Sequence, residues 1–240
     1  MKLFFALAIS FIAIATGFSQ DLHSEVLLEK AINYHDPHRN WSQFKNTFTI
    51  EMTMPNAPER TSVITINLPA EYFSVTATKD TVTATYTLDK GRCQMRYNSQ
   101  VLDSISAKEK NMTCDKATLY KNYYSYLYGL PMKLRDPGTN LNDSVEKKRF
   151  KGKDYLVLKV TYDDAVGSDV WYFYFNTKTY AMEIYQFFKT DEHGKEKPDS
   201  GEYILLSEEV VVNGIKMPKV RAWYYNKEDK YLGTDTLVEE

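Results

Sequence analysis

TVTATYTL, the stretch at residues 81–88, alternates threonine with an apolar residue at every step. Side chains of an extended strand point alternately to its two faces. Val82, Ala84, Tyr86 and Leu88 therefore share one face, and the threonines share the other. This period of two predicts a strand that buries one face and exposes the other.

The residues on either side of this stretch carry the same period. Apolar and polar residues alternate at residues 48–54, 64–68 and 73–77. The turn residues Asp89-Lys90-Gly91 lead into a further strand at residues 92–97. The N-terminal half is therefore predicted to form an antiparallel meander.

The C-terminal half predicts further strands separated by residues typical of turns. They are expected at residues 145–151, 154–162, 169–175, 180–189, 202–212, 215–225 and 230–237. Asn213-Gly214 is the strongest hairpin signal, because both residues tolerate the positive φ angles of a two-residue turn. Residues 170–175 and 180–188 are bulky on both faces, so both faces should be covered.

Two segments have the spacing of helices. Residues 24–34 carry apolar residues on one side, with Ser24 as the expected N-cap, and the helix must end before Pro37. Residues 117–128 have helical composition, with Thr113 as the expected N-cap. Rings lie on two sides of this second helix, so other structure should largely cover it.

These elements predict an α+β fold that is mostly β. The expected architecture is a single curved antiparallel sheet of about 11–12 strands, an unclosed half-barrel wrapped around two or three helices. Such a sheet explains the strands that are bulky on both faces, because the helices cover one face and aromatic rings partly close the other.

The N-terminal residues have the layout of a secretory signal peptide. A lysine precedes the apolar run at residues 3–14, and small residues follow it. We expect a signal peptide at residues 1–19 and a single β-rich domain at residues 20–240. The sequence shows no other stretch long and apolar enough for a transmembrane helix, and no cysteine for a lipid anchor near the cleavage region. The mature protein is expected to be soluble, in the periplasm or outside the cell.

Charge and composition narrow the class of partner. The formal net charge is -2, with both signs mixed along the chain. Nucleic acids and anionic membrane surfaces attract basic stripes, so neither is expected as a partner. Tyrosine (19) outnumbers phenylalanine (12), which predicts many large rings with polar tips on half-apolar surfaces.

Cys93 and Cys114 are the two cysteines of the chain. An exported protein meets oxidising conditions, so we expect them to form a disulfide that contributes about 3 kcal/mol through the unfolded state. The alternative is a pair of buried free thiols. A redox-active pair is disfavoured, because the two residues lack the close spacing that tunes a thiolate.

His35-Asp36-Pro37-His38 is the one cluster of residue types that bind metals or transfer protons. His35, Asp36 and His38 could hold a divalent ion, or His35 and Asp36 could act as a base and its orienting group, with Trp41 nearby. The favoured interpretation is a helix terminus, because the spacing matches no zinc signature.

No other motif specifies chemistry. The sequence contains no Gly-x-Ser-x-Gly nucleophile turn and no glycine-rich phosphate loop. We therefore assign no catalytic residue, no metal ligand and no cofactor, and enzyme activity is disfavoured.

Five aromatic residues are the candidate lining of a ligand pocket. Along the second helix Tyr120, Tyr124 and Tyr128 share one face, and Trp171 and Trp223 lie on predicted strands. Rings offer a large contact area for an acyl chain or a sugar at low entropy cost. For any one ring, the alternative is a place in an ordinary core.

Several motifs together resemble a family of exported proteins from Bacteroidota, numbered 6503 among the domains of unknown function. The resemblance extends from about Leu27 to Leu237 and rests on these segments: Tyr34-His35-Asp36-Pro37 with Trp41, Gly129-Leu130-Pro131-Met132-Lys133-Leu134, Asp136-Pro137-Gly138, Asp169-Val170-Trp171-Tyr172-Phe173 and Asn213-Gly214-Ile215-Lys216-Met217-Pro218.

More remotely, the order of helix, strands, inserted helix and strands resembles the LolA-like carriers of the bacterial envelope. The segment at residues 173–180 is similar in style to a hairpin of theirs. The resemblance implies an unclosed, strongly bent sheet with helices inside, which holds acyl chains. A shared fold does not by itself transfer function.

Three hypotheses of function follow. The first is an envelope protein that binds a lipid or another apolar ligand in a concave, aromatic-lined interior. The second is a non-enzymatic interaction or assembly protein of the envelope, with a filled core and a protein partner. The third is a metal-dependent hydrolase centred on His35, Asp36 and His38.

Overall fold

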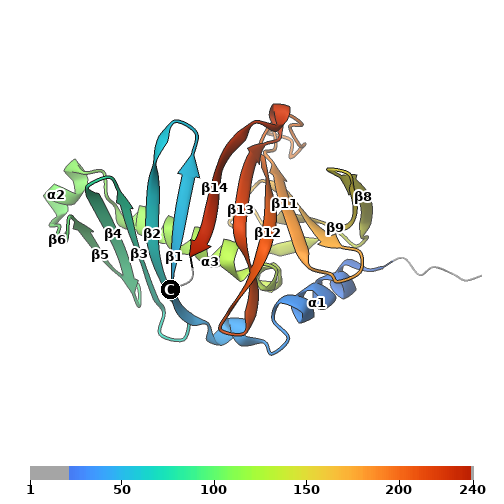
Figure 1. The fold of residues 1–240 in the computed structure, drawn as a ribbon, viewed down its shortest axis with the longest axis horizontal. Helices are drawn as coiled ribbons and strands as arrows, with labels where there is room; N and C mark the ends of the chain where they lie inside the picture. Colours follow the sequence, from blue (N-terminus) through green and yellow to red (C-terminus); the bar gives the residue numbers. More distant parts are fainter. Residues whose placement is uncertain (1–21, 239–240) are drawn as a thin grey trace, which may run out of the picture.

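The computed structural model describes residues 22–238 of the chain. The signal peptide expected at residues 1–19 lies outside the described residues. Within residues 22–238, one antiparallel sheet of fourteen strands contains all the named strands (Figure 1). The predicted fold class, a single unclosed sheet around helices, is confirmed. Within the same residues, no helix is long and apolar enough to cross a membrane.

The sheet consists of two meanders joined in its middle. The first contains β1 (Lys45–Met54), β2 (Ala57–Asn67), β3 (Tyr72–Lys79), β4 (Val82–Asp89), β5 (Arg92–Tyr97) and β6 (Gln100–Val101). The second contains β9 (Lys153–Tyr162), β10 (Val170–Asn176), β11 (Met182–Phe188), β12 (Glu202–Val212), β13 (Ile215–Tyr225) and β14 (Tyr231–Val238). The last strand, β14, pairs with β1 and so connects the two halves. The short strands β7 (Thr139–Leu141) and β8 (Glu146–Phe150) both pair with β9.

In the order of the chain, most of the helices come directly before or directly after the first meander. The helix α1 (Ser24–His35) and the 3-10 helix η1 (Asn40–Gln43) precede it. The helices α2 (Ser104–Glu109) and α3 (Cys114–Gly129) and the 3-10 helix η2 (Met132–Arg135) follow it, and η3 (Lys227–Asp229) connects β13 to β14. Figure 1 shows α3 running across the sheet behind β1, β14 and β13.

The inner face of the first meander packs against α3 through pairs of rings. The ring centroids are 4.7 Å apart for Phe48 and Tyr128, 6.4 Å for Phe73 and Tyr124, and 5.1 Å for Tyr86 and Tyr120. On the outer face, threonine hydroxyls pair across the strands, as in Thr76 with Thr85 at 3.0 Å. The alternation at residues 81–88 thus separates a buried inner face from an outer face of polar pairs.

A disulfide joins Cys93 in β5 to Cys114, the first residue of α3. The side chain of Thr113 caps α3 by accepting a hydrogen bond from the Lys116 backbone N–H at 3.2 Å. The start of α3 is therefore fixed to the sheet by a covalent bond and to its own backbone by the cap.

The strands that were predicted to be covered on both faces, at residues 170–175 and 180–188, contribute to a second apolar cluster besides the main core. It consists of Tyr155, Val157, Val170, Tyr172, Tyr174 and Ile184, with Phe150, Phe188 and Leu205 packed against it. The Tyr172 hydroxyl donates a hydrogen bond to Glu196, in the loop before β12, at 2.8 Å. This loop and β8 therefore pack against the second apolar cluster, whereas the outer face of the first meander carries the threonine pairs.

Several local expectations differ from the structure. The helix α1 has His23 as its N-cap, and the Ser24 hydroxyl instead donates to the backbone carbonyl of Asn142. The expected cover of α3 is incomplete, because Leu119 is 64% exposed and Tyr123 is 40% exposed. The short strands β6 and β7 have no expected counterpart, because two or three residues are too few to show a period.

Candidate functional site

The imidazole of His35 connects α1 to two strands of the sheet. Its Nδ1 lies 2.8 Å from the backbone carbonyl of Lys216 in β13, and its Nε2 accepts a hydrogen bond from the Met182 N–H at 2.9 Å. Because a carbonyl only accepts, Nδ1 carries the proton and the ring is neutral. Both ring nitrogens are therefore occupied by the fold.

The carboxylate of Asp36 shapes the turn after α1. Its two oxygens accept hydrogen bonds from the backbone N–H groups of Asn40 and Trp41, each at 2.8 Å. The Trp41 ring then packs on Phe44, with ring centroids 5.1 Å apart. Asp36 is fully buried, so these two bonds satisfy a charge that would otherwise be costly to bury.

The structure does not support a metal site at His35, Asp36 and His38. His38 is exposed, whereas the other two side chains are buried and bonded to the backbone. Within residues 22–238, no group of three or more His, Cys, Asp or Glu side chains is arranged to hold a metal ion. The cluster that the sequence singled out acts as a structural corner between α1, β11 and β13.

This corner makes stability depend on pH. Burial lowers the pKa of His35 below its usual value of 6.5, although the hydrogen bond to Lys216 opposes the shift. As the pH falls below the pKa of His35 in the unfolded chain, the unfolded chain binds a proton at His35 that the folded chain does not bind. The free energy of unfolding therefore falls. We expect the free energy of unfolding by urea to decrease between about pH 7 and pH 5, and His35→Gln to flatten this decrease.

His38→Gln is the matched control for this measurement, because His38 is exposed and three residues away. We expect its urea curves to follow those of the unchanged protein at each pH. Equal flattening in both variants would contradict the role given to His35.

The structure does not gather the five predicted rings into one pocket. Tyr124 and Tyr128 are buried between α3 and the sheet, and Tyr120 packs on Tyr86, so these three rings form part of the core. Trp223 lies on the other flank of α3, beside Tyr123 at a ring-centroid distance of 6.5 Å. Of the five, Trp171 alone lines a hollow of about 860 Å³ at another part of α3.

Two adjoining hollows run along one flank of α3, and we call them together the α3 groove. The larger has a volume of about 860 Å³ and the smaller about 250 Å³. They share Leu68, Lys121 and Ser125. The larger hollow is further lined by Asn122, Tyr126, Lys133, Asp136, Pro137, Thr139, Tyr162, Ala165, Val166, Gly167, Ser168, Asp169 and Trp171. The smaller is further lined by Ile66, Asn67, Glu71, Tyr72, Phe73, Leu88, Gly91 and Thr118.

Three rings form the aromatic wall of the larger hollow. Tyr126 of α3 lies edge to face with Trp171, at 5.8 Å between ring centroids, and its hydroxyl bonds to the Tyr162 hydroxyl. Burial raises the pKa of Tyr162 to about 12 and that of Tyr126 well above its usual value. Both tyrosines are therefore neutral at physiological pH and present polar tips within an apolar wall.

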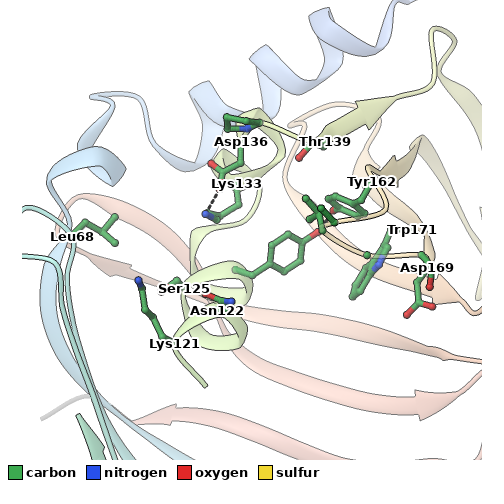
Figure 2. Close-up of a pocket in the computed structure, with 16 residues that line it drawn as sticks. Leu68, Lys121, Asn122, Ser125, Lys133, Asp136, Thr139, Tyr162, Asp169 and Trp171 are labelled. Carbon is green, nitrogen blue, oxygen red and sulfur yellow. Dashed lines mark hydrogen bonds and ion pairs between the residues drawn. The ribbon is translucent and has the colours of Figure 1, made fainter. Parts of the chain in front are cut away.

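Charged groups lie at the two ends of the larger hollow. Figure 2 shows Lys121 and Lys133 on the side of Leu68, and Asp169 beside Trp171 at the other end. Lys133 forms an ion pair with Asp136. Burial raises the pKa of Asp169, and the nearby charge of Lys189 opposes the shift.

The loop at residues 163–169 closes one side of the larger hollow, and Gly138 lets it approach. A Cβ atom at Gly138 would lie 2.8 Å from Val166 Cγ2, so a larger residue would push this loop away. The Asn140 side chain also donates to Asp163 at 2.8 Å. The Asp136-Pro137-Gly138 segment therefore positions a wall of the groove.

Sequence reasoning missed most residues of the groove. Lys121, Asn122, Ser125 and Tyr126 repeat at the spacing of one helical face, which was the available signal. The apolar and aromatic faces of α3 give the stronger sequence pattern, and they pointed away from this polar face. No sequence pattern indicated the wall residues Tyr162 and Asp169, because only the folded chain brings them to the same hollow as the residues of α3.

Comparisons with known proteins identify the family of the chain and its fold. Residues 2–240 match the family described as "Family of unknown function (DUF6503)". None of the curated proteins matches the sequence. The crystal structure of a LolA superfamily protein from Nitrosomonas europaea is similar at a TM-score of 0.52 and 12% identity, over 91% of this chain and 92% of that chain. That of a DUF1329 family protein from Desulfovibrio piger gives a TM-score of 0.47 and 8% identity, over 90% and 91%. The resemblance to the family of unknown function is thus confirmed, whereas its expected origin in Bacteroidota stays a prediction. The resemblance to the LolA-like fold is also confirmed, and it concerns the fold alone.

Proposed function

We propose that this chain, which belongs to the DUF6503 family, is an exported envelope protein that holds a lipid, an acyl chain or another apolar ligand in the α3 groove. The observation that carries the proposal is the smaller hollow, whose wall includes the half-buried apolar side chains of Leu68 and Tyr72 beside the buried core side chains Ile66, Phe73 and Leu88. An apolar ligand in the hollow would remove the remaining exposed apolar surface of Leu68 and Tyr72 from water.

The size and walls of the groove fit this proposal. Small-molecule sites are concave, about 300–1,000 Å³ in volume, and mostly apolar with a few polar groups. The larger hollow, at about 860 Å³, lies within that range, and its aromatic wall has this character. The LolA-like fold adds a weaker argument, by analogy with a superfamily and not by shared residues.

Export and a single domain belong to the same proposal. Residues 1–19 have the layout of a signal peptide, and a disulfide is favoured outside the cytoplasm. Because one sheet runs through the described part of the chain, residues 20–240 are proposed to form one domain.

The first test is mass spectrometry of an organic extract of the protein, purified without detergent from the envelope of its own cells. We expect lipid in stoichiometric amount, absent from an exported control protein of similar size. A clean extract would favour the alternative of an interaction protein with a protein partner.

A second test blocks the groove at its smaller hollow. Thr118 is exposed and lines that hollow, so Thr118→Trp should fill it and weaken binding of the neutral dye N-phenylnaphthylamine. Leu119→Trp is the matched control, because Leu119 is the next residue of α3, is 64% exposed and does not line the groove. Equal dye binding by the unchanged protein and both variants would place the apolar site elsewhere.

One observation keeps the interaction protein as the second candidate. On the other flank of α3, a hollow of about 210 Å³ is lined mainly by apolar residues: Met52, Met54, Tyr123, Trp223, Leu232, Gly233 and Asp235. Met54 and Tyr123 are each 40% exposed there. An exposed apolar surface is typical of a contact with another molecule.

A further inference from the structure

The two hollows of the α3 groove differ in chemistry. The smaller presents the half-buried apolar side chains of Leu68 and Tyr72, and the buried core residues Ile66, Phe73 and Leu88 lie beside them in its wall. The larger carries hydroxyl, amide and charged groups beside its rings. A ligand that occupies both hollows would match them best if one part of it were apolar and another part polar. A polar group against an apolar wall loses its hydrogen bonds to water and forms none with the protein.

Lys121 lies where the two hollows meet, since it lines both. Within residues 22–238 its ammonium forms no ion pair, whereas Lys133, on the same side of the groove in Figure 2, is paired with Asp136. Two carboxylates also border the groove. Asp169 lies at the far end beside Trp171, and Glu71 is exposed on the rim of the smaller hollow. Within residues 22–238, Lys121 is therefore the lysine of the groove whose ammonium is free to accept a counter-ion from a ligand.

We propose that the ligand is an amphiphile with an anionic head group, a carboxylate or a phosphate, which pairs with Lys121 while its chain lies against Leu68 and Tyr72. This inference rests on the proposed function and names the ligand class of the same groove. A neutral or cationic head group would leave the ammonium without a partner. Lys121 is exposed, so the expected gain from the pair is modest.

The test uses a set of ligands that share one chain and differ in head group. Dodecanoate and dodecyl phosphate are anionic, dodecanol is neutral and dodecyltrimethylammonium is cationic. Each competes with N-phenylnaphthylamine for the full-length mature protein at low salt. We expect one or both of the anions to bind about two- to fivefold more tightly than dodecanol, and the cation to bind most weakly. The better of the two anions identifies the carboxylate or the phosphate as the preferred group.

Lys121→Gln should remove this preference, so that the anions bind no more tightly than dodecanol. Lys121→Glu should reverse it in favour of the cation. Lys116→Gln is the matched control, because Lys116 lies on the same helix, bonds to the Asn111 carbonyl and does not line the groove. Raising the salt concentration should reduce the preference in the unchanged protein, because salt screens a pair between exposed charges.

The outcomes separate this inference from the proposed function. Equal binding of anions and dodecanol by the unchanged protein would overturn the head-group site and leave the apolar site standing. A Lys121→Gln variant that loses affinity for all ligands alike would also overturn it, since the side chain would then act through its carbon chain. If neither the dye nor any ligand binds, both proposals fail.

Discussion

Replacing Arg221 with alanine is expected to lower the free energy of unfolding by about 3–5 kcal/mol, because the change removes one partner from a buried charge cluster. Arg221 is 1% exposed. Its guanidinium lies 3.9 Å above the Tyr128 ring and donates to the backbone carbonyls of Pro218 and Leu127, at 3.2 and 3.5 Å. The side chain therefore links β13 to the end of α3.

The strand register explains why removing Arg221 affects more than one contact. Arg221 in β13 lies directly opposite Asp235 in β14. On the other side of Asp235 the row continues with Met52 in β1 and then Arg60 in β2. This row crosses four neighbouring strands beneath α3. Burial raises the pKa of Asp235, and the charges of Arg221 and Arg60 oppose that shift. Without Arg221, Asp235 keeps the cost of its burial and loses the larger of its two compensating charges.

Urea unfolding of three variants measures this effect. Arg149→Ala is the control for an exposed arginine, since the Arg149 side chain is 68% exposed and pairs with Asp154, and it should cost less than about 1 kcal/mol. The double variant Arg221→Met, Asp235→Leu should regain much of the loss, because it removes both charges and retains volume. If Arg221→Ala costs no more than Arg149→Ala, the cluster contributes nothing to stability.

Gly129→Val should destabilise the protein by about 3 kcal/mol, through overpacking at the end of α3. A Cβ atom at Gly129 would lie 2.6 Å from Lys133 Cγ and 2.7 Å from Trp41 Cε2. The tryptophan is held by its own backbone bond to Asp36, so it has little room to move. The glycine thus lets α3 and the corner after α1 approach each other.

Thermal unfolding tests this contact in the Gly129→Val variant and in a double variant with a smaller residue at Trp41. Trp41→Leu in the Gly129→Val background should lose less stability than the two separate losses added together, because the smaller side chain makes room for valine. Gly167→Val is the control, since no atom lies within 4 Å of a Cβ there and its φ is not in the left-handed range. Additive losses from Gly129→Val and Trp41→Leu would mean that the two residues do not compete for space.

The local elements were predictable because their signals come from neighbours in the chain. The strand at β5, residues Arg92–Tyr97, lies where the sequence placed it, between a turn and a change of pattern. The Asn213-Gly214 turn joins β12 to β13, with both residues at positive φ. The cap at Thr113 sets the start of α3 as expected. Each of these depends on a few adjacent residues and on backbone sterics.

The candidate site was predictable only in part. Trp171 lines the groove, but the tyrosines that shared its expected role fill the core instead. On a helix, a ring that lines a pocket and a ring that fills a core have the same spacing, so the pattern cannot separate them. His35 and Asp36 form a structural corner for a similar reason, because their partners Met182 and Lys216 are far away in the sequence.

By itself, the sequence determined the mostly β fold class, the turns and the amphipathic strands, because alternation, capping and turn chemistry act over a few residues. Only the tertiary structure decided that β14 pairs with β1, that Arg221 and Asp235 are buried beneath α3, and that Lys121 lies between two hollows without an ion-pair partner among residues 22–238. These features depend on which apolar faces pack together across long separations. Burial and charge pairing are properties of that packing, so they exist only once the sheet has bent around α3.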